Sequence, residues 1–213
     1  MAQSVLNLLR REFEQGRGLA DVTTMYDAAR VIGNTVRTVA AMDREALEKD
    51  GFKFNVNFIL GGQVKGEAPA LYMIYPQGNP LQATEESPYL QIGETKYGRP
   101  ILDRNIQFER TSLEEAAKLA LLSLDSTMKS NVTVGPPIDL LAYAVGELEF
   151  TARRRFEEDD PDLIKMKTRW SQNLRQAVLR LPDIRLKPHV PRAGEGEKSI
   201  EVVEPGGERK EEG

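Results

Sequence analysis

The sequence predicts an α+β fold in which layers of helices pack on antiparallel sheets. The first observation is the order of the expected elements along the 213 residues, which is two helices, three strands, a helix, two strands and a helix. Because the strands follow one another instead of alternating one to one with helices, this order argues against a doubly wound parallel sheet. The other two observations are the apolar alternation of residues 54–60 and a helix-capping signature at residues 112–115.

The first part of the chain is predicted to be a helical hairpin with one buried face. Apolar side chains at helical spacing predict a helix over residues 3–15, and the glycines in residues 16–18 are expected to end it. Asp21 has the side chain of an N-cap and is expected to start the second helix. The apolar positions are Val5, Leu8, Leu9 and Phe13 in the first helix, and Val22, Met25, Tyr26, Ala29, Ile32, Val36 and Val39 in the second.

Three short strands are expected after this hairpin. Apolar side chains alternate along residues 54–60, and Gly61 with Gly62 is expected to end that strand. The alternation returns in residues 71–75, and residues 88–93 supply a further short apolar segment. The three segments together predict an antiparallel meander.

The second half of the chain adds a helix, two strands and a last helix. The capping box SLEE at residues 112–115 precedes apolar side chains at helical spacing as far as Leu124, which predicts a helix. Residues 138–150 are predicted to form two strands that turn near Gly146. Residues 160–161, Asp-Pro, are expected to open the last helix, because proline is favoured at the first helical position.

Composition predicts one folded domain over residues 1–185, followed by a disordered acidic tail over residues 186–213. Hydrophobic residues make up 40% of the chain and charged residues 29%, which is typical of a soluble globular protein. The tail is rich in proline, glycine and glutamate, so it cannot bury enough apolar area to offset the entropy lost on ordering.

Several kinds of chemistry are excluded by the residue inventory. The absence of cysteine excludes disulfides, thiolate nucleophiles and cysteine-based metal sites, and a single histidine, His189, leaves little for histidine-based sites. We therefore expect no cofactor and no metal. A net charge of -4 argues against nucleic acid and anionic membranes as partners. The chain shows neither a signal peptide nor an apolar run long enough for a bilayer, so a cytoplasmic location is expected.

Three segments in order resemble one known family. They are FILGGQVKGEAPALYMIYPQGN at residues 58–79, YLQIGETKYGRPILDR at residues 89–104 and SLEEAAKLALLSLDSTMKSNVTVGPP at residues 112–137. This series is similar to the proteasome β-type subunits, and most similar to the bacterial branch called the ancestral β subunit. The resemblance implies the four-layer αββα sandwich of N-terminal nucleophile hydrolases and a threonine-type peptidase. In such enzymes the α-amino group of the first residue is the general base, and its pKa of about 7.7 to 8 suits that role.

The start of the chain departs from this family pattern. Met1 and Ala2 carry neither a hydroxyl nor a thiol, so neither is the expected nucleophile. In the family, strands that carry the nucleophile, an acidic residue and a lysine precede the first helix, and this sequence starts at that helix. We therefore expect the N-terminal catalytic strands, roughly forty to fifty residues, to be absent and the sandwich to be incomplete at its N-terminus.

The resemblance assigns supporting catalytic roles to three residues. Glu94 lies in the loop after Ile92-Gly93, where the family usually has serine, and the alternative, which the sequence favours, is a solvated turn. Ser130 and Thr133 fall on the family positions of an acidic residue and a serine that follow the capped helix. Both hydroxyls can bond a terminal amine, but Ser130 cannot supply the charge of a carboxylate. The alternative for this pair is a polar helix end and loop.

Three hypotheses for function follow from this sequence. The first is a proteasome-like threonine-type hydrolase subunit that acts on peptide or protein substrates inside a homo-oligomeric ring or open ring. The second is a non-catalytic assembly or interaction subunit, which requires a partner to cover the sheet edge that the absent strands leave exposed. The third is a free-standing α+β binding module unrelated to proteolysis.

Overall fold

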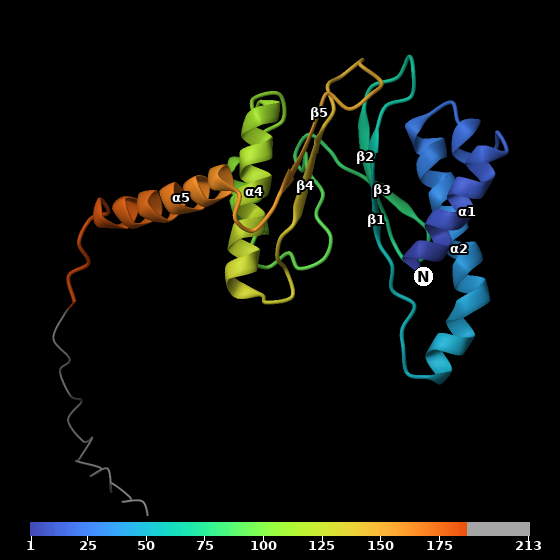
Figure 1. Ribbon diagram of the computed structural model, residues 1–213, viewed down its shortest axis with the longest axis horizontal. Helices are drawn as coiled ribbons and strands as arrows, with labels where there is room; N and C mark the ends of the chain where they lie inside the picture. The colour runs from blue at the N-terminus through green and yellow to red at the C-terminus, as the bar shows by residue number, and fades with distance from the viewer. Residues whose placement is uncertain (187–213) are drawn as a thin grey trace, which may run out of the picture. The chain divides into compact units, whose positions relative to one another are not determined.

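The computed structural model describes residues 1–186 and confirms an α+β fold (Figure 1). The chain divides into two compact units, residues 1–174 and 175–213, and the first unit contains every strand and all helices except the end of the last. The predicted tail, apart from Leu186, lies outside the described residues, as does His189. Within the described part, no helix is both long and apolar enough to cross a membrane.

The helical hairpin is confirmed, but its predicted N-cap is wrong. Helix α1 spans Ala2–Glu14 and α2 spans Met25–Lys49, and a short 3₁₀ helix, η1, spans Gly18–Ala20 between them. Asp21 is the residue that follows η1, so it does not start α2. Thr24 caps α2 instead, because its backbone is extended and its side chain accepts a hydrogen bond from the backbone N–H of Asp27.

The first three strands form an antiparallel sheet in the order β1-β2-β3. Strand β1 spans Phe58–Gly62, β2 spans Ala70–Ile74 and β3 spans Pro80–Gln82. The prediction that the first strand ends at Gly61 and Gly62 is confirmed, since they are the last two residues of β1 and pair with Leu71 and Ala70 at that end of the ladder. Residues 54–57 lie outside the ladder, so the strand begins four residues later than predicted.

The third strand lies in a different place from the one predicted. Residues 88–93 form no strand, and β3 begins directly after the tight turn at residues 75–79. In this turn the N–H of Tyr75 donates to the carbonyl of Asn79, and Gly78 has φ +74°. The turn brings the chain straight back beside β2, where Pro80 is tolerated because β3 is an edge strand.

Helix α2 packs on the three-stranded sheet and forms the main core with it. The tightest approach is between two glycines, because a Cβ on Gly33 of α2 would collide with the carbonyl oxygen of Gly78 in the β2–β3 turn. Next to it, Arg37 Nε donates to the carbonyl of Gln77 over 2.9 Å. The residues buried to 1% exposure or less in this core are Val5, Ala29, Val36, Val39 and Ile74.

The second half of the first unit contains two helices and a two-stranded sheet. Helix α3, Arg99–Asn105, was not predicted, whereas α4, Leu113–Ser130, begins at the predicted cap, where Ser112 accepts from the N–H of Glu115. Strand β4, Ile138–Ala142, pairs with β5, Ala152–Phe156. The second strand was placed inside residues 138–150, and this is wrong because the connecting loop extends to residue 151.

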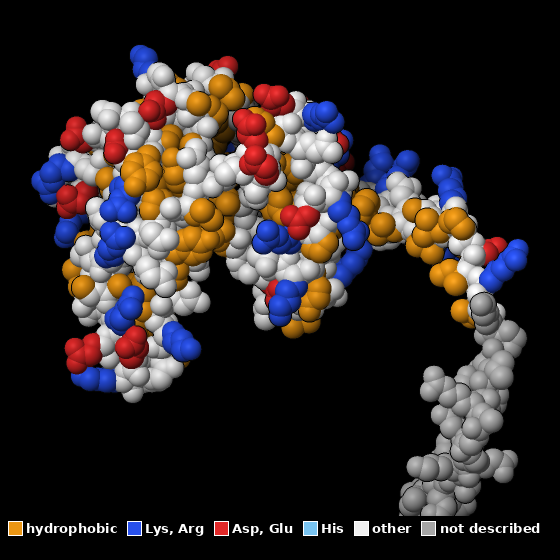
Figure 2. Space-filling model, turned by 180° about the vertical axis from the view of Figure 1, so that it is seen from behind, with side chains coloured by type: hydrophobic (Ala, Val, Ile, Leu, Met, Phe, Trp, Pro, Cys, Tyr) orange, Lys and Arg blue, Asp and Glu red, His pale blue; other side chains and the backbone are white. Residues whose placement is uncertain are grey.

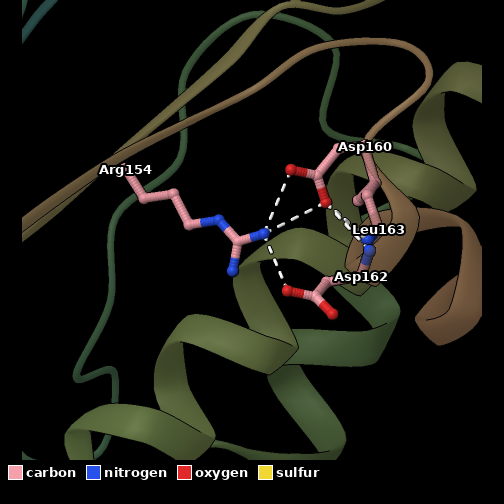
Figure 3. A network of polar contacts seen from close by, with 4 residues as sticks. All are labelled: Arg154, Asp160, Asp162 and Leu163. Atoms are coloured by element: carbon pink, nitrogen blue, oxygen red, sulfur yellow. Dashed lines mark hydrogen bonds and ion pairs between the residues drawn. The ribbon is translucent and has the colours of Figure 1, made fainter.

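Helix α5, Pro161–Leu179, begins at the predicted Asp-Pro pair and is capped by a network of charges (Figure 3). Asp160 Oδ1 accepts hydrogen bonds of 3.0 Å from the backbone N–H groups of Asp162 and Leu163. The Arg154 guanidinium of β5 donates to both oxygens of Asp160 and to Asp162. This network joins the two-stranded sheet to the start of α5.

The variant Asp160→Asn is expected to lose a pH-dependent part of the stability. The N–H of Leu163 and the charge of Arg154 lower the pKa of Asp160 below its ordinary value of 3.8. Because the folded pKa is the lower one, the stabilisation is present above about pH 4 and is lost as pH falls through the folded pKa. Urea titrations between pH 7 and about pH 3 should show a steeper fall for the wild type than for the variant.

Asp159→Asn is the matched control, because Asp159 makes no hydrogen bond or ion pair among the described residues. Its titration should parallel that of the wild type. A variant at Asp160 that also parallels the wild type would contradict the role of this cap.

Candidate functional site

The three predicted site residues come from two segments that the structure brings into contact. Glu94 lies in the loop of residues 93–98, and Ser130 and Thr133 lie at and just beyond the end of α4. Gly98, at the end of that loop, is buried against α4, and a Cβ there would lie 2.8 Å from Thr127 Oγ1. The end of the loop therefore packs against the last turns of α4.

The conformation of Glu94 is set by a turn. Gly93 has φ +85°, a conformation that favours glycine, and the N–H of Lys96 donates to Glu94 Oε1 over 3.0 Å. Glu94 is half-buried. Among the described residues, no hydrogen bond or ion pair joins Glu94 to Ser130 or Thr133.

Thr133 is held by an Asn side chain just after α4. The N–H and the hydroxyl of Thr133 donate to Asn131 Oδ1 over 2.9 and 2.7 Å. The N–H of Asn131 in turn bonds the carbonyl of Thr127, which continues the helix pattern past Ser130. Because the hydroxyl proton of Thr133 is engaged, its oxygen lone pairs stay free to accept a bond from an amine. Ser130 and Thr133 are both exposed.

Sequence reasoning missed a row of buried polar side chains on α4. Ser123, Asp125 and Thr127 are 3%, 2% and 2% exposed. Lys129 Nζ lies 3.0 Å from Asp125 Oδ2 without the angle of a hydrogen bond, and Lys167 Nζ lies 3.8 Å from Oδ1. The signal in the sequence was the (i, i+4) spacing of Asp125 and Lys129, a pattern that is common on exposed helix faces. The carboxylate instead joins α4 to α5.

Tyr89 fixes the segment that leads to the Glu94 loop. Its hydroxyl donates to Asp103 Oδ1 of α3 over 2.5 Å. Burial, together with this bond to a carboxylate, raises the pKa of Tyr89 to about 12. At neutral pH the phenol therefore keeps its proton and serves as a hydrogen-bond donor that ties residues 88–93 to α3.

A separate open cavity of about 1150 Å³ lies beside the three-stranded sheet. Leu71 of β2 and Gln82 of β3 contribute to its lining, together with the loop between β4 and β5. Glu94, Ser130 and Thr133 are not among its lining residues. The predicted site residues and the cavity are thus two distinct places in the first unit.

One amide side chain connects the two hairpins beside this cavity. Gln63 Oε1 accepts from the hydroxyl of Tyr143 over 2.9 Å and from the N–H of Gly146 over 2.8 Å. Gln63 Nε2 donates to the carbonyl of Glu67 within its own hairpin loop. Gln63 therefore ties the β1–β2 loop to the β4–β5 loop.

Comparisons with known proteins agree with this architecture. A family model described as proteasome subunit matches residues 22–141. A curated proteasome subunit beta from Haloquadratum walsbyi is 27% identical over 158 residues, which span 74% of this chain but only 58% of that relative. Anbu, an ancestral beta-subunit, from Yersinia bercovieri is 39% identical with a TM-score of 0.80, over 88% of this chain and 77% of that one. A helical assembly of the Anbu complex from Pseudomonas aeruginosa gives 44% identity and a TM-score of 0.81, over 86% and 76%.

These similarities establish the family of the chain, and they therefore test the hypotheses drawn from the sequence. The family model covers more than half of the chain, and the Anbu structures match most of its described length at about 40% identity. They exclude the third hypothesis, a module unrelated to the proteasome. The chain belongs to the proteasome subunit family, in its ancestral β-subunit (Anbu) branch.

Proposed function

We propose that this chain is part of a bacterial, cytoplasmic threonine-type peptidase that hydrolyses peptides or proteins within an assembly of its own copies. The observation that carries this proposal is the similarity to Anbu structures over 86% to 88% of the chain. An assembly is supported by the structure of the Pseudomonas aeruginosa relative, which is described as helical. Met1 and Ala2 provide no nucleophile, so we assign that role to a residue outside these 213.

The proposal includes the four-layer αββα sandwich. Two features of the first unit support it. Helix α2 packs on one face of the three-stranded sheet, and α4 packs on the two-stranded sheet. The face of β1 and β2 opposite α2 is also apolar, with Ile59 and Leu71 in its centre, as expected of a sheet that meets a second sheet.

In this proposal the loop at residues 93–98 and the end of α4 support the terminal nucleophile. Ser130 and Thr133 accept or donate hydrogen bonds at the terminal amine, and Glu94 supplies a negative charge near it. The amine removes the proton of the nucleophile's hydroxyl, and the oxygen attacks the peptide carbonyl. The same proton then passes to the leaving amine as the C–N bond breaks, which releases one half of the peptide and leaves the other as an ester on the nucleophile. The resulting ester is hydrolysed by water that the same amine activates.

The test is made on the protein isolated from its native source. Its intact mass and N-terminal sequence should reveal a terminal threonine, and fluorogenic peptides should be cleaved. Selective acylation of the α-amino group near pH 7 should abolish cleavage, since that amine has a pKa about 2 units below that of lysine. A protein that begins at Met1 or Ala2 and leaves peptides intact would overturn the proposal and favour the non-catalytic assembly subunit.

Thr133→Ala, made in the protein that carries the nucleophile, should lower kcat for peptide cleavage about tenfold or more. The physical reason is the loss of a hydrogen-bond partner for the amine that moves the proton. Thr133→Ser keeps the hydroxyl and should retain most of the activity. Thr38→Ala, at an exposed threonine of α2, is the matched control. Unchanged turnover in Thr133→Ala, with the assembly intact, would refute this role.

A further inference from the structure

A buried carboxylate on α4 has no part in the mechanism proposed above. Asp125 is 2% exposed, and its Oδ2 accepts no hydrogen bond from the described residues. Two ammonium groups lie beside it, with Lys129 Nζ 3.0 Å from Oδ2 and Lys167 Nζ 3.8 Å from Oδ1. Lys129 Nζ also donates a hydrogen bond to Ser171 Oγ of α5 over 3.1 Å. We call these four side chains the Asp125 cluster.

The stability of the fold gives little reason for a carboxylate at this position. Taking a carboxylate out of water costs free energy that its partners offset only where the geometry is good. Here one oxygen lacks a hydrogen bond, and a buried ion pair can often be replaced by apolar side chains without loss of stability. The Asp125 cluster is therefore better explained by the positions that it fixes than by the stability that it adds.

Helix α5 supplies a positive charge that meets Asp125. Hydrophobic and basic side chains are seen together along the helix that leads to the grey residues in Figure 2. Within α5, one acidic residue, Asp162, is present with four basic ones, which are Lys165, Lys167, Arg169 and Arg175. Of these four, Lys167 is half-buried and the others are exposed. Asp125 is thus the carboxylate of α4 that faces the buried ammonium of a basic helix.

The end of α4 is held from two sides. Gly98, at the end of the Glu94 loop, packs against Ser123 and Thr127. Asp125 is two residues from each of them, which places it about 160° around the helix, on the nearly opposite side. The Asp125 cluster joins that opposite side to α5. The last turn of α4 therefore lies between two buried polar contacts.

This last turn connects the Asp125 cluster to the proposed supporting residues. Ser130 follows Lys129 directly in the chain. The N–H of Asn131 donates to the carbonyl of Thr127, and Asn131 Oδ1 in turn accepts from the N–H and the hydroxyl of Thr133. A shift of the turn would therefore move the hydroxyls of both Ser130 and Thr133.

We propose that Asp125 is a positioning residue, which acts through Lys129 on the placement of the Ser130 and Thr133 hydroxyls. Asp125 holds the Lys129 side chain toward α5, and the two side chains of α5 in the cluster fix the position of that pair. The inference rests on the proposed function, in which the two hydroxyls bond the terminal amine. Asp125 acts from inside the fold and not on the substrate.

The kinetic test is made in the complete protein that carries the nucleophile, with fluorogenic peptides as substrates. Asp125→Asn keeps the size of the side chain but removes its charge, and it should lower kcat about tenfold, because small displacements around a reacting centre are costly. In a background that lacks both hydroxyls, Ser130→Ala with Thr133→Ala, the same change should lower the residual kcat less than about twofold. A role in stability alone would lower kcat by the same factor in both backgrounds, and that result would overturn the proposal.

Lys129 gives a second test with less risk to folding, because its side chain is 54% exposed. Lys129→Met removes the ammonium and should lower kcat about fivefold, whereas Lys129→Arg keeps a positive charge and should stay within about twofold of the wild type. A Lys129→Met protein with the kcat of the wild type would contradict the proposed route from Asp125 to the two hydroxyls.

Glu45→Gln is the matched control for Asp125→Asn. Glu45 Oε1 lies 2.9 Å from Lys49 Nζ with the same (i, i+4) spacing, but on α2 and with a side chain that is 85% exposed. The control removes the same charge from an ion pair in water, and such pairs contribute little. Its kcat and its hydrogen exchange should match those of the wild type.

Hydrogen exchange separates a failure of this inference from a failure of the proposed function. In Asp125→Asn, the amides of residues 131–134 should exchange about tenfold faster than in the wild type, and those of β1 and β2 should be unchanged, since only the end of α4 opens. Exchange needs no hydrolysis, so it still decides whether Asp125 fixes the end of α4 if the wild type cleaves no peptide and the proposed function fails. Unchanged exchange at residues 131–134, or faster exchange throughout the chain, would overturn the inference and leave the peptidase proposal standing.

Discussion

Gly33→Ala should lower the free energy of unfolding by at least about 2 kcal/mol. A Cβ at this position of α2 would collide with the carbonyl oxygen of Gly78 and lie 3.0 Å from its carbonyl carbon. Both partners are main chain, so no rotamer change can relieve the contact, and overpacking of this kind costs about 1 to 3 kcal/mol or more. The cost outweighs the gain of about 1 kcal/mol in helix propensity on replacing glycine by alanine. Urea unfolding measures the difference.

Gly135→Ala is the matched control for this methyl group. No atom lies within 4 Å of a Cβ built on Gly135, and its φ is not positive. Its unfolding midpoint should stay close to that of the wild type. If Gly33→Ala were equally neutral, the close approach of α2 to the β2–β3 turn would be wrong.

Gly98→Ala should cost about 2 kcal/mol and also disturb the Glu94 loop. Its Cβ would collide with Ser123 Oγ and lie 2.6 Å from the carbonyl oxygen of Ser123 and 2.8 Å from Thr127 Oγ1. To relieve these contacts the loop must move away from α4, which carries the proposed supporting residues at its end. In the complete protein, activity should therefore fall with stability.

A second substitution separates the two parts of this clash. Ser123→Ala removes the hydroxyl but leaves the backbone carbonyl, so it should recover part of the stability lost in Gly98→Ala. The double variant is compared with Ser123→Ala alone, since the Ser123 hydroxyl can itself contribute to the free energy of unfolding of the wild type. Full additivity of the two single changes would argue against direct contact between them.

Elements with strong local signals were predicted well from the sequence. The capping box before α4 and the Asp-Pro start of α5 depend on hydrogen bonds within a few residues, and the structure contains both helix starts. The helical hairpin of α1 and α2 follows from one apolar stripe on each helix. Thr24 caps α2 in place of Asp21 because Asp21 follows the end of η1 and has its backbone at ψ 12°, whereas Thr24 has the extended backbone of an N-cap.

Elements defined by distant partners were predicted less well. Strand β5 has the sequence ARRRF, with only Phe156 buried, so its apolar alternation is absent and its pairing with β4 decides its place. Strand β3 is short and begins at a proline, both of which weaken the strand signal. The segment at residues 88–93 has the apolar character of a strand but bonds to α3 through Tyr89.

The proposed supporting residues could be located from the sequence only through the family resemblance. The residues that surround them could not be predicted, because their position depends on Gly98 packing on the side of α4. The burial of Asp125 could not be predicted from the sequence either. A carboxylate four residues before a lysine normally lies in water, whereas Asp125 is 2% exposed and lies 3.8 Å from Lys167 of α5, a neighbour far along the chain.

The Gln63 bridge has a consequence for folding kinetics. Its partners Tyr143 and Gly146 lie 80 and 83 positions further along the chain, so the two bonds can form only after both hairpins exist. We expect contacts of such long range to form late in folding, and contacts that are absent from the transition state act mainly by slowing unfolding. The two bonds are thus expected to slow the separation of the β1–β2 and β4–β5 loops. Hydrogen exchange at the amide of Gly146 measures how often its bond to Gln63 opens.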